Sequence, residues 1–285
     1  MPVVTQYYSF SFNGQTFGGA GSPYQIFEVN GLEGLPGIRN QDDNRGYADG
    51  MFTGRDFLAG RTITITFLTL ASSGASAQAN FNTIQRALLP QTSGTTPLYF
   101  QLSNAESEQV INARVRALRT TVTPEYTYGY IMSQVEFFCP DPRYYNNLDQ
   151  TLTLTYSAPT GRVYNRTYNL TYGGGSATLS GTVSNAGWAT TYPTITIVGP
   201  IINPVVGNST VGNTLSLTGT FSAADTIEID LYNKLITLNN NAARNLLTSG
   251  NWFGAEPGNN TFTLFGTGTL DGVTGATITW QAAYV

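Results

Sequence analysis

The sequence predicts a mainly β protein built from two modules, with one amphipathic helix in the first. Three features of the 285 residues predict this class: charged residues make up only 11%, glycine and aromatic residues are frequent, and apolar and polar residues alternate over short stretches. An average globular domain carries about 25% charged residues. A turn-rich β protein has such a composition, whereas a helical bundle or a disordered tail does not.

Strict alternation of apolar and polar residues identifies the predicted strands. It occurs at 62–67, 111–116, 151–155, 194–197, 227–231 and 277–280. A period of two places one face of each strand in a core and the other in water or in an interface. Antiparallel sandwiches or barrels have this pattern, whereas parallel α/β sheets need long apolar strands separated by amphipathic helices.

One segment, residues 76–89, has a helical period instead. Its apolar residues recur at spacings of four, three and four, at Ala77, Phe81, Ile84 and Leu88. This stripe predicts an amphipathic helix that lies on a sheet and ends before Pro90. A shorter stretch at 242–248 is a weaker candidate helix.

A proline-rich run marks the predicted domain boundary. The prolines at positions 140 and 142 lack the donors that a strand ladder needs, and they hold the residues before them extended. We therefore expect one module at 1–147, with mixed strands and the helix, and a second at 148–285, with strands and turns alone.

The counts of reactive side chains exclude several chemistries. The chain has no histidine, which excludes a Ser-His-Asp triad, a Cys-His pair and a histidine metal site. Its one cysteine, Cys139, cannot form an internal disulfide or a cysteine zinc cluster, and its apolar neighbours Phe137 and Phe138 predict a buried structural thiol. We predict no catalytic residue, no metal ligand and no cofactor.

One pair of carboxylates could suggest an enzyme. Glu228 and Asp230 share a strand face about 7 Å apart, a spacing that suits a glycosidase pair or a divalent cation. The opposite face carries Ile227, Ile229 and Leu231, so the carboxylates are what the solvated face of a strand should carry. We therefore expect Glu228 and Asp230 to lie on a solvent-exposed strand face and not in a catalytic or metal site.

A second charged segment is the predicted contact loop at 40–50. Its candidate contact residues, with a neighbouring subunit or a lumen, are Asp42, Asp43, Arg45 and Asp49. The segment lacks the glutamate at the twelfth position of an EF-hand loop, where Thr53 stands instead, so we interpret it as a polar interaction loop.

Two further sets of residues are candidates for binding. Arg114 and Arg116 share a strand face and could pair with carboxylates of a neighbour, although a solvated face explains them as well. Trp188, Trp252 and Phe253 are either platforms that stack on sugars or ordinary anchors of a core or an interface.

The net charge of −4 and the absence of a run of Lys and Arg predict no specific nucleic-acid binding. No stretch approaches about 18 uninterrupted apolar residues, so we expect no membrane anchor. The first residues lack the basic and apolar regions of a secretory signal, and we expect synthesis in the cytoplasm.

Several short motifs also follow one another in a characteristic order. The first half carries 27–39, an Asp49-Gly50 turn, a strand at 61–65, the helix and the exit at 135–145. The second half carries 194–200, 226–230, 235–239, 251–253 and 256–262. In this order the motifs resemble the distal tail protein family of long-tailed, non-contractile phages.

That resemblance implies a structural virion protein and not an enzyme. It implies a homo-hexameric ring at the distal end of the tail tube, formed by a tail-tube-like N-terminal module, with a galectin-like antiparallel β-sandwich pointing outward. The implied partners are the tail tube protein, the tail-tip hub protein and peripheral receptor-binding proteins, and the implied place is the virion tail after assembly in the host cytoplasm. DNA would pass through the lumen without specific binding. The alternative is a carbohydrate-binding β-sandwich module used in host-surface recognition.

Overall fold

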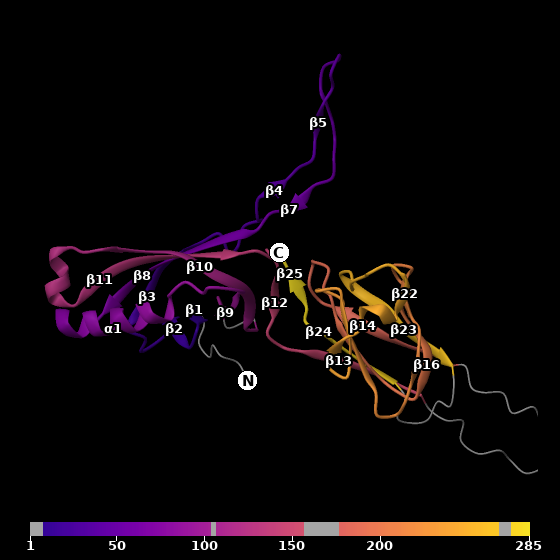
Figure 1. Ribbon diagram of the computed structural model, residues 1–285. Coiled ribbons are helices and arrows are strands. Elements are labelled where there is room, and N and C mark those ends of the chain that lie inside the picture. The colour runs from indigo at the N-terminus through magenta and orange to yellow at the C-terminus, as the bar shows by residue number, and fades with distance from the viewer. Residues whose placement is uncertain (1–7, 104–106, 157–176, 268–274) are drawn as a thin grey trace, which may run out of the picture. The chain divides into compact units, whose positions relative to one another are not determined.

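The computed structural model describes residues 8–103, 107–156, 177–267 and 275–285, and most of them lie in antiparallel strands (Figure 1). The predicted mainly β class is confirmed. The chain divides into two compact units, the first ending at Asn147 and the second running from Leu148 to Tyr284, while Val285 belongs to the first.

The first unit is built on one antiparallel sheet. Its strands are β1 (Ser9–Phe12), β2 (Gln15–Gly18), β3 (Tyr24–Asn30), β8 (Arg61–Leu70), β9 (Thr96–Gln101), β10 (Gln109–Thr121), β11 (Tyr130–Cys139) and β12 (Tyr144–Asn146). They follow the order β2-β1-β9-β10-β11-β8-β3, with β12 also paired to β10. The long strand β10 pairs with β9 through Ala113 and with β11 from Arg114 onward, so it joins the two halves of the sheet.

Helix α1 (Gly74–Ala87) packs its apolar stripe on β8 and β11. It begins two residues before the predicted 76–89 because the hydroxyl of Ser73 accepts a hydrogen bond from the Ser76 N–H and caps the first turn. Ala77 and Ile84 are buried, as the stripe predicts. A single 3₁₀ turn, η1 (Pro124–Tyr128), connects β10 to β11.

Aromatic side chains fill the core of the first unit. Phe17 and Phe67 meet edge to face with ring centroids 5.0 Å apart, and Phe12 and Phe137 lie 4.9 Å apart. Along β8 every second residue is buried, so that Ile63, Ile65, Phe67 and Thr69 face this core, whereas Thr62, Thr64 and Thr66 face the other way. The period of two in the sequence therefore reports the two faces of the strand correctly.

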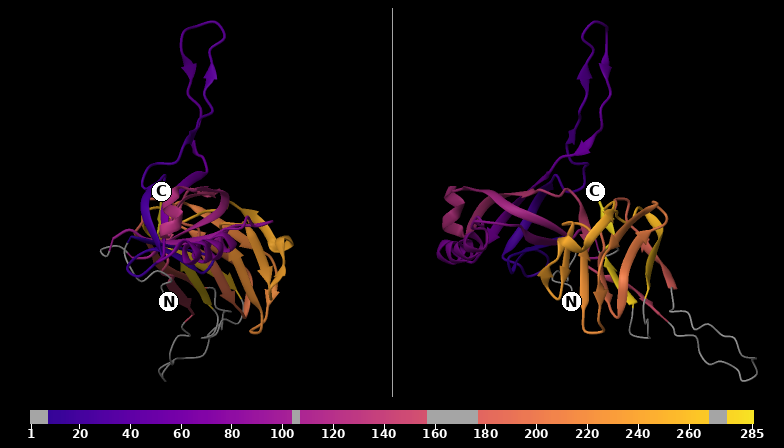
Figure 2. Two further views of the ribbon diagram at one scale, coloured as in Figure 1. Left: turned by 90° about the vertical axis from the view of Figure 1, so that its left-hand side faces the viewer. Right: turned by 45° about the vertical axis from the view of Figure 1, so that its right-hand side comes forward.

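Between β3 and β8 the chain leaves the sheet as a long hairpin (Figures 1 and 2), and we call residues 37–59 the arm. Two ladders of two residues each hold it together, β4 (Ile38–Arg39) with β7 (Phe57–Leu58) and β5 (Asp43–Asn44) with β6 (Met51–Phe52). At its base the Ala59 N–H donates to the Gly37 carbonyl at 2.7 Å.

The second unit is a sandwich of two antiparallel sheets. One sheet has the order β13 (Gln150–Thr155), β24 (Gly275–Trp280), β15 (Thr194–Val198), β19 (Thr226–Asp230), β20 (Leu235–Leu238) and β21 (Asn241–Ala242). The other has the order β14 (Ala177–Asn185), β23 (Gly258–Thr267), β16 (Ile201–Asn208), β17 (Asn213–Leu217) and β22 (Leu247–Gly250), with β18 (Thr220–Phe221) beside β16. A short strand, β25 (Ala283–Tyr284), lies near the C-terminus.

The inner faces of both sheets form one core, which includes Ile195 and Ile229 from the first sheet and Val206 and Phe262 from the second. The weaker helix prediction at 242–248 is wrong. The helical part of this stretch is only the 3₁₀ turn η2 (Arg244–Leu246), because β21 ends at Ala242 and the chain returns to a strand at Leu247, which pairs with β17.

Candidate functional site

The predicted contact loop at 40–50 forms most of the outer arm. Asp43 lies opposite Phe52 and Asn44 opposite Met51 in the outer ladder, and the Arg45 N–H donates to the Gly50 carbonyl at 3.4 Å across the turn. The segment is thus a ribbon with a defined register, and all of its residues from 40 to 50 are exposed except Asp42, which is partly buried.

Two of the four predicted contact residues also make bonds inside the arm. The carboxylate of Asp42 accepts hydrogen bonds from the Gly54 N–H at 2.9 Å and from the Asn40 amide at 3.0 Å. The Arg45 guanidinium lies 5.0 Å from the centre of the Phe52 ring, within the range of a cation–π contact. Asp43 and Asp49 are exposed.

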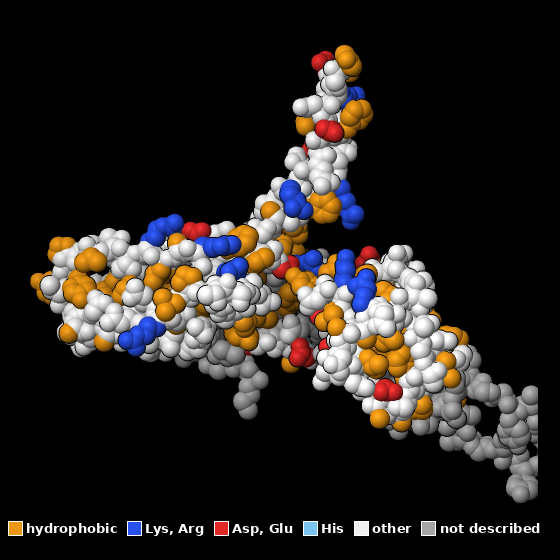
Figure 3. All heavy atoms as spheres, viewed as in Figure 1, with side chains coloured by type: hydrophobic (Ala, Val, Ile, Leu, Met, Phe, Trp, Pro, Cys, Tyr) orange, Lys and Arg blue, Asp and Glu red, His pale blue; other side chains and the backbone are white. Residues whose placement is uncertain are grey.

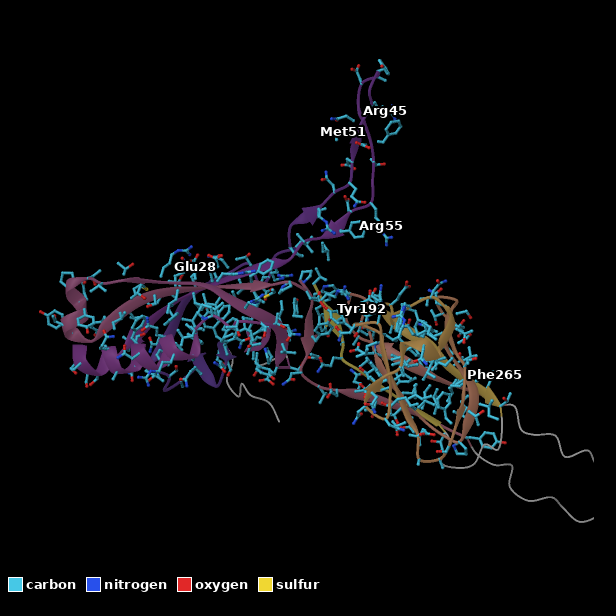
Figure 4. All side chains as sticks on the ribbon, in the orientation of Figure 1. Glu28, Arg45, Met51, Arg55, Tyr192 and Phe265 are labelled. Atoms are coloured by element: carbon cyan, nitrogen blue, oxygen red, sulfur yellow. The ribbon has the colours of Figure 1, made fainter. Side chains whose placement is uncertain are left out.

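The arm also carries apolar side chains that the interpretation as a polar loop overlooked. Tyr47 is fully exposed, and Ile38, Met51 and Phe52 are each half-exposed or more. Figure 3 shows hydrophobic side chains along the whole arm, and Arg45, Met51 and Arg55 project from it in Figure 4. A ribbon of two strands is marginally stable by itself in water, and exposed apolar groups of this extent mark interaction sites.

The second set of candidate contact residues, Arg114 and Arg116, lies on β10. Arg114 donates to the Gln91 carbonyl of its own chain at 3.3 Å, and Arg116 lies 5.0 Å from the Phe138 ring centre. The ladder between β10 and β11 shifts register between Val115 and Ala117, so Arg116 sits at a bulge. Both arginines have partners within the chain, and their pairing with a neighbour remains a prediction.

The three aromatic residues proposed as a sugar platform have different surroundings. Trp188 is 64% exposed and meets Tyr284 edge to face at 4.7 Å. Trp252 packs partly on the core, with the Arg244 guanidinium 5.1 Å from its ring. Phe253 is 3% exposed and belongs to the core, so it offers no face for stacking, and the platform does not form from all three residues.

Buried asparagines hold the loop that carries Trp252 and Phe253 in place through hydrogen bonds to its backbone. The Asn208 amide donates to the Gly254 carbonyl at 2.9 Å and to Asn260 at 3.1 Å. Asn260 in turn donates to the Glu256 carbonyl and accepts from the Glu256 N–H. These fully buried amides satisfy the loop backbone, as buried polar groups require.

The acidic residues near β19 serve local turns. Asp230 accepts from the N–H groups of Tyr232 and Asn233, each at 2.9 Å. Hydrogen bonds from Asn239 and Ser222 hold the pKa of Asp225 below its ordinary value. Among the residues that the structure describes, no group of three or more acidic or cysteine side chains is placed to hold a metal ion.

Cys139 is buried on β11, and this burial raises the pKa of its thiol from 9.0 to about 12. A thiol that stays protonated at neutral pH is a poor nucleophile, so the predicted structural role fits its surroundings. Within the described ranges, no helix has both the length and the hydropathy that crossing a membrane requires.

Comparison with known proteins finds a match to a family model within the second unit. Residues 186–284 match the model of the siphovirus-type tail component, C-terminal domain. No curated protein matches the sequence. The family match and the fold comparison that follows confirm the predicted resemblance to distal tail proteins of siphophages.

Solved structures are similar over nearly the whole chain. The Dit protein of phage SPP1, described as a paradigm of the hub adsorption apparatus in phages that infect Gram-positive bacteria, aligns with a TM-score of 0.68 at 16% identity, over 97% of this chain and 99% of that one. Chains from the activated baseplate of phage P2 with Ca, and of phage p2 with Sr, give TM-scores of 0.49 and 0.47 at 12% and 13% identity. They cover 95% and 93% of this chain and 93% of each baseplate chain.

Proposed function

Since the chain carries the C-terminal domain of siphovirus-type tail components on a fold like that of SPP1 Dit, we propose that it is the adaptor at the distal end of a phage tail tube. In this proposal six copies form a ring through the first unit, and the second unit points outward. The ring joins the tube to the tail-tip hub and holds receptor-binding proteins. Its role is structural and involves no catalysis. The observation that carries the proposal is the family match of residues 186–284.

The arm supports a ring made from copies of this chain. Its ladders are two residues long and its apolar side chains are exposed, so it gains stability when another surface covers it. If the arm of one copy packs on a different surface of the next copy, the contact is head-to-tail, and contacts of this type close into rings when the rotation allows it.

The charge of the chain suits a lumen through which DNA passes. The net charge is −4 and Lys234 is the only lysine. A weakly acidic wall does not collect phosphates, because binding to the DNA backbone depends on clustered Lys and Arg. We therefore propose passage of DNA without specific binding.

Charge reversal in the arm tests the proposal. We expect the purified chain at micromolar concentration to give rings with six subunits in negative-stain images and a species at six times the chain mass in mass photometry. The double variant D42K/D43K should lose this species, because it reverses two charges on the contact ribbon. The matched control E228K/E256K changes the net charge equally at exposed positions of the second unit and should still assemble.

A further variant separates the contact from the internal bond of Asp42. Asp42→Asn keeps an oxygen that can accept from the Gly54 N–H, so it preserves the arm while removing one charge. D42N should weaken ring assembly less than D42K/D43K does. A chain that stays monomeric even with tube and hub proteins present, or a D42K/D43K variant that assembles like the unaltered chain, would contradict the proposal.

A further inference from the structure

A buried arginine lies where the arm joins the sheet. Arg61 opens β8 directly after the arm, and it is only 2% exposed. Its Nε donates to the Pro142 carbonyl at 3.1 Å. Its Nη1 faces the carbonyls of Gly31 at 3.0 Å and Gly34 at 2.8 Å, and also that of Leu32. The guanidinium of Arg61 thus contacts two other stretches of the chain and, together with its own strand, links three.

These three stretches are the two roots of the arm and the start of a connecting segment. Residues 31–34 lead from β3 toward the arm, and residue 61 receives the chain as it returns. Pro142 precedes β12, from which the chain continues to the second unit. At Gly31 the backbone has φ +81°, and a Cβ there would come within 2.1 Å of the Thr62 carbonyl oxygen, so the two roots are closely packed.

Stability alone is a poor explanation for this arginine. Among the described residues no carboxylate forms an ion pair with it, and its buried Nη2 has no hydrogen-bond partner. The Tyr144 ring lies 5.8 Å from its Cζ. Burial lowers the pKa of Arg61 from its ordinary value, yet a guanidinium remains protonated in proteins. Buried charges without an ionic partner are costly, and apolar replacements of similar volume are often neutral or stabilising.

We propose that Arg61 is a positioning residue that fixes the direction of the arm and ties it to the segment at 142–146. The functional value of a fixed arm direction rests on the proposed role of the arm in assembly. The planar fork of the guanidinium reaches several carbonyls at once with little loss of side-chain freedom, whereas a lysine ammonium is a compact charge on a flexible stem. The arm then leaves the sheet in one direction, which a ring of identical contacts requires.

The distance between one spin label on the arm and one on the sheet measures how uniformly the arm is directed. One label is placed on the arm at Ile38→Cys, which is 63% exposed, and the other on β10 at Thr121→Cys, which is also exposed. The native Cys139 is buried with a thiol pKa of about 12, so it should remain unlabelled. In dilute, monomeric protein we expect one narrow distance peak. Arg61→Lys and Arg61→Met should each lose the single narrow peak.

The matched control is Arg55→Met, which removes an arginine of the arm whose guanidinium lies over the Phe57 ring at 5.3 Å. It should keep the narrow peak. If R61M does not fold, R61K retains the charge and serves as the test by itself. A narrow peak that is unchanged in R61K overturns the proposal, as does an equal broadening in R55M.

Ring assembly of the same variants separates this inference from the proposed function. A broad distance distribution in R61K together with normal rings supports Arg61 as the positioning residue but contradicts assembly through the arm. A narrow distribution in R61K together with normal rings contradicts the positioning role and leaves the ring proposal intact.

Discussion

Aromatic side chains of the second unit divide between its core and its surface, and this division decides what each can do. Phe253 packs edge to face on Phe262 with ring centroids 5.7 Å apart, and both are buried. Trp188 is mostly exposed beside Tyr284. Of the three aromatics considered for sugar stacking, Trp188 therefore offers the most accessible ring.

Replacing these residues separates a core role from a binding role. Phe253→Ala should lower the free energy of unfolding by about 3 to 5 kcal/mol, because it leaves a cavity in the core. Trp188→Ala should cost much less, since most of that ring already meets water. Urea denaturation followed by tryptophan fluorescence or circular dichroism measures both.

The same pair tests the carbohydrate-binding alternative on a glycan array. A glycan that binds the unaltered chain and is lost in W188A, with the fold retained, would favour that alternative over a purely structural role. Equal losses of stability in F253A and W188A would contradict the assignment of Trp188 to the surface.

Elements with a buried face could be predicted from the sequence. The alternation at 62–67 lies within β8, and the stripe from Ala77 to Leu88 follows α1, because each pattern reflects one side packed in a core. The arm could not be predicted in this way. It buries no face within the chain, so Met51, Phe52 and Phe57 show no period, and its charged residues suggested only a polar loop.

The first turn of α1 depends on one hydroxyl that the apolar stripe did not reveal. Ser73 accepts from the Ser76 N–H at 3.3 Å and lies within hydrogen-bond distance of the Ser76 hydroxyl. Ser73→Ala should cost about 1 kcal/mol of unfolding free energy, because it leaves an N–H of the first turn without its cap. The exposed neighbour Ser72 offers a control, and Ser72→Ala should change stability by less than about 0.5 kcal/mol. Equal effects of the two changes in thermal or urea unfolding would contradict the cap.

At the scale of the whole molecule, contacts between distant segments are what the sequence does not reveal. The composition predicts a mainly β fold and the order of motifs predicts a resemblance to phage tail components, and both are confirmed. Arg61 was not among the predicted site residues. Its partners at positions 31–34 and 142 lie 27 to 81 residues away and are carbonyls, which every residue type has. No local pattern reports such a site.

The second unit has its own core and its own complete sheets, as an independently folding domain does. The core of the second unit consists only of residues between Leu152 and Trp280, and both of its sheets are complete within 148–284. A sandwich of this size buries enough apolar surface to be stable without help from another domain. We therefore expect a fragment of residues 148–285 to unfold cooperatively in calorimetry and to show ordered near-ultraviolet circular dichroism.

Core variants in the full chain complete this test. Phe262→Ala removes a buried ring from the second unit, and Phe137→Ala removes one from the first. Each loses about 3 to 5 kcal/mol from its own unit, which lowers the midpoint of that unit by about 10 to 20 °C. F262A should therefore shift one calorimetric transition and F137A the other, because destabilisation acts only on the cooperative unit that contains the cavity. A fragment that remains unfolded, or two variants that shift one common transition, would mean that the units fold as a single body.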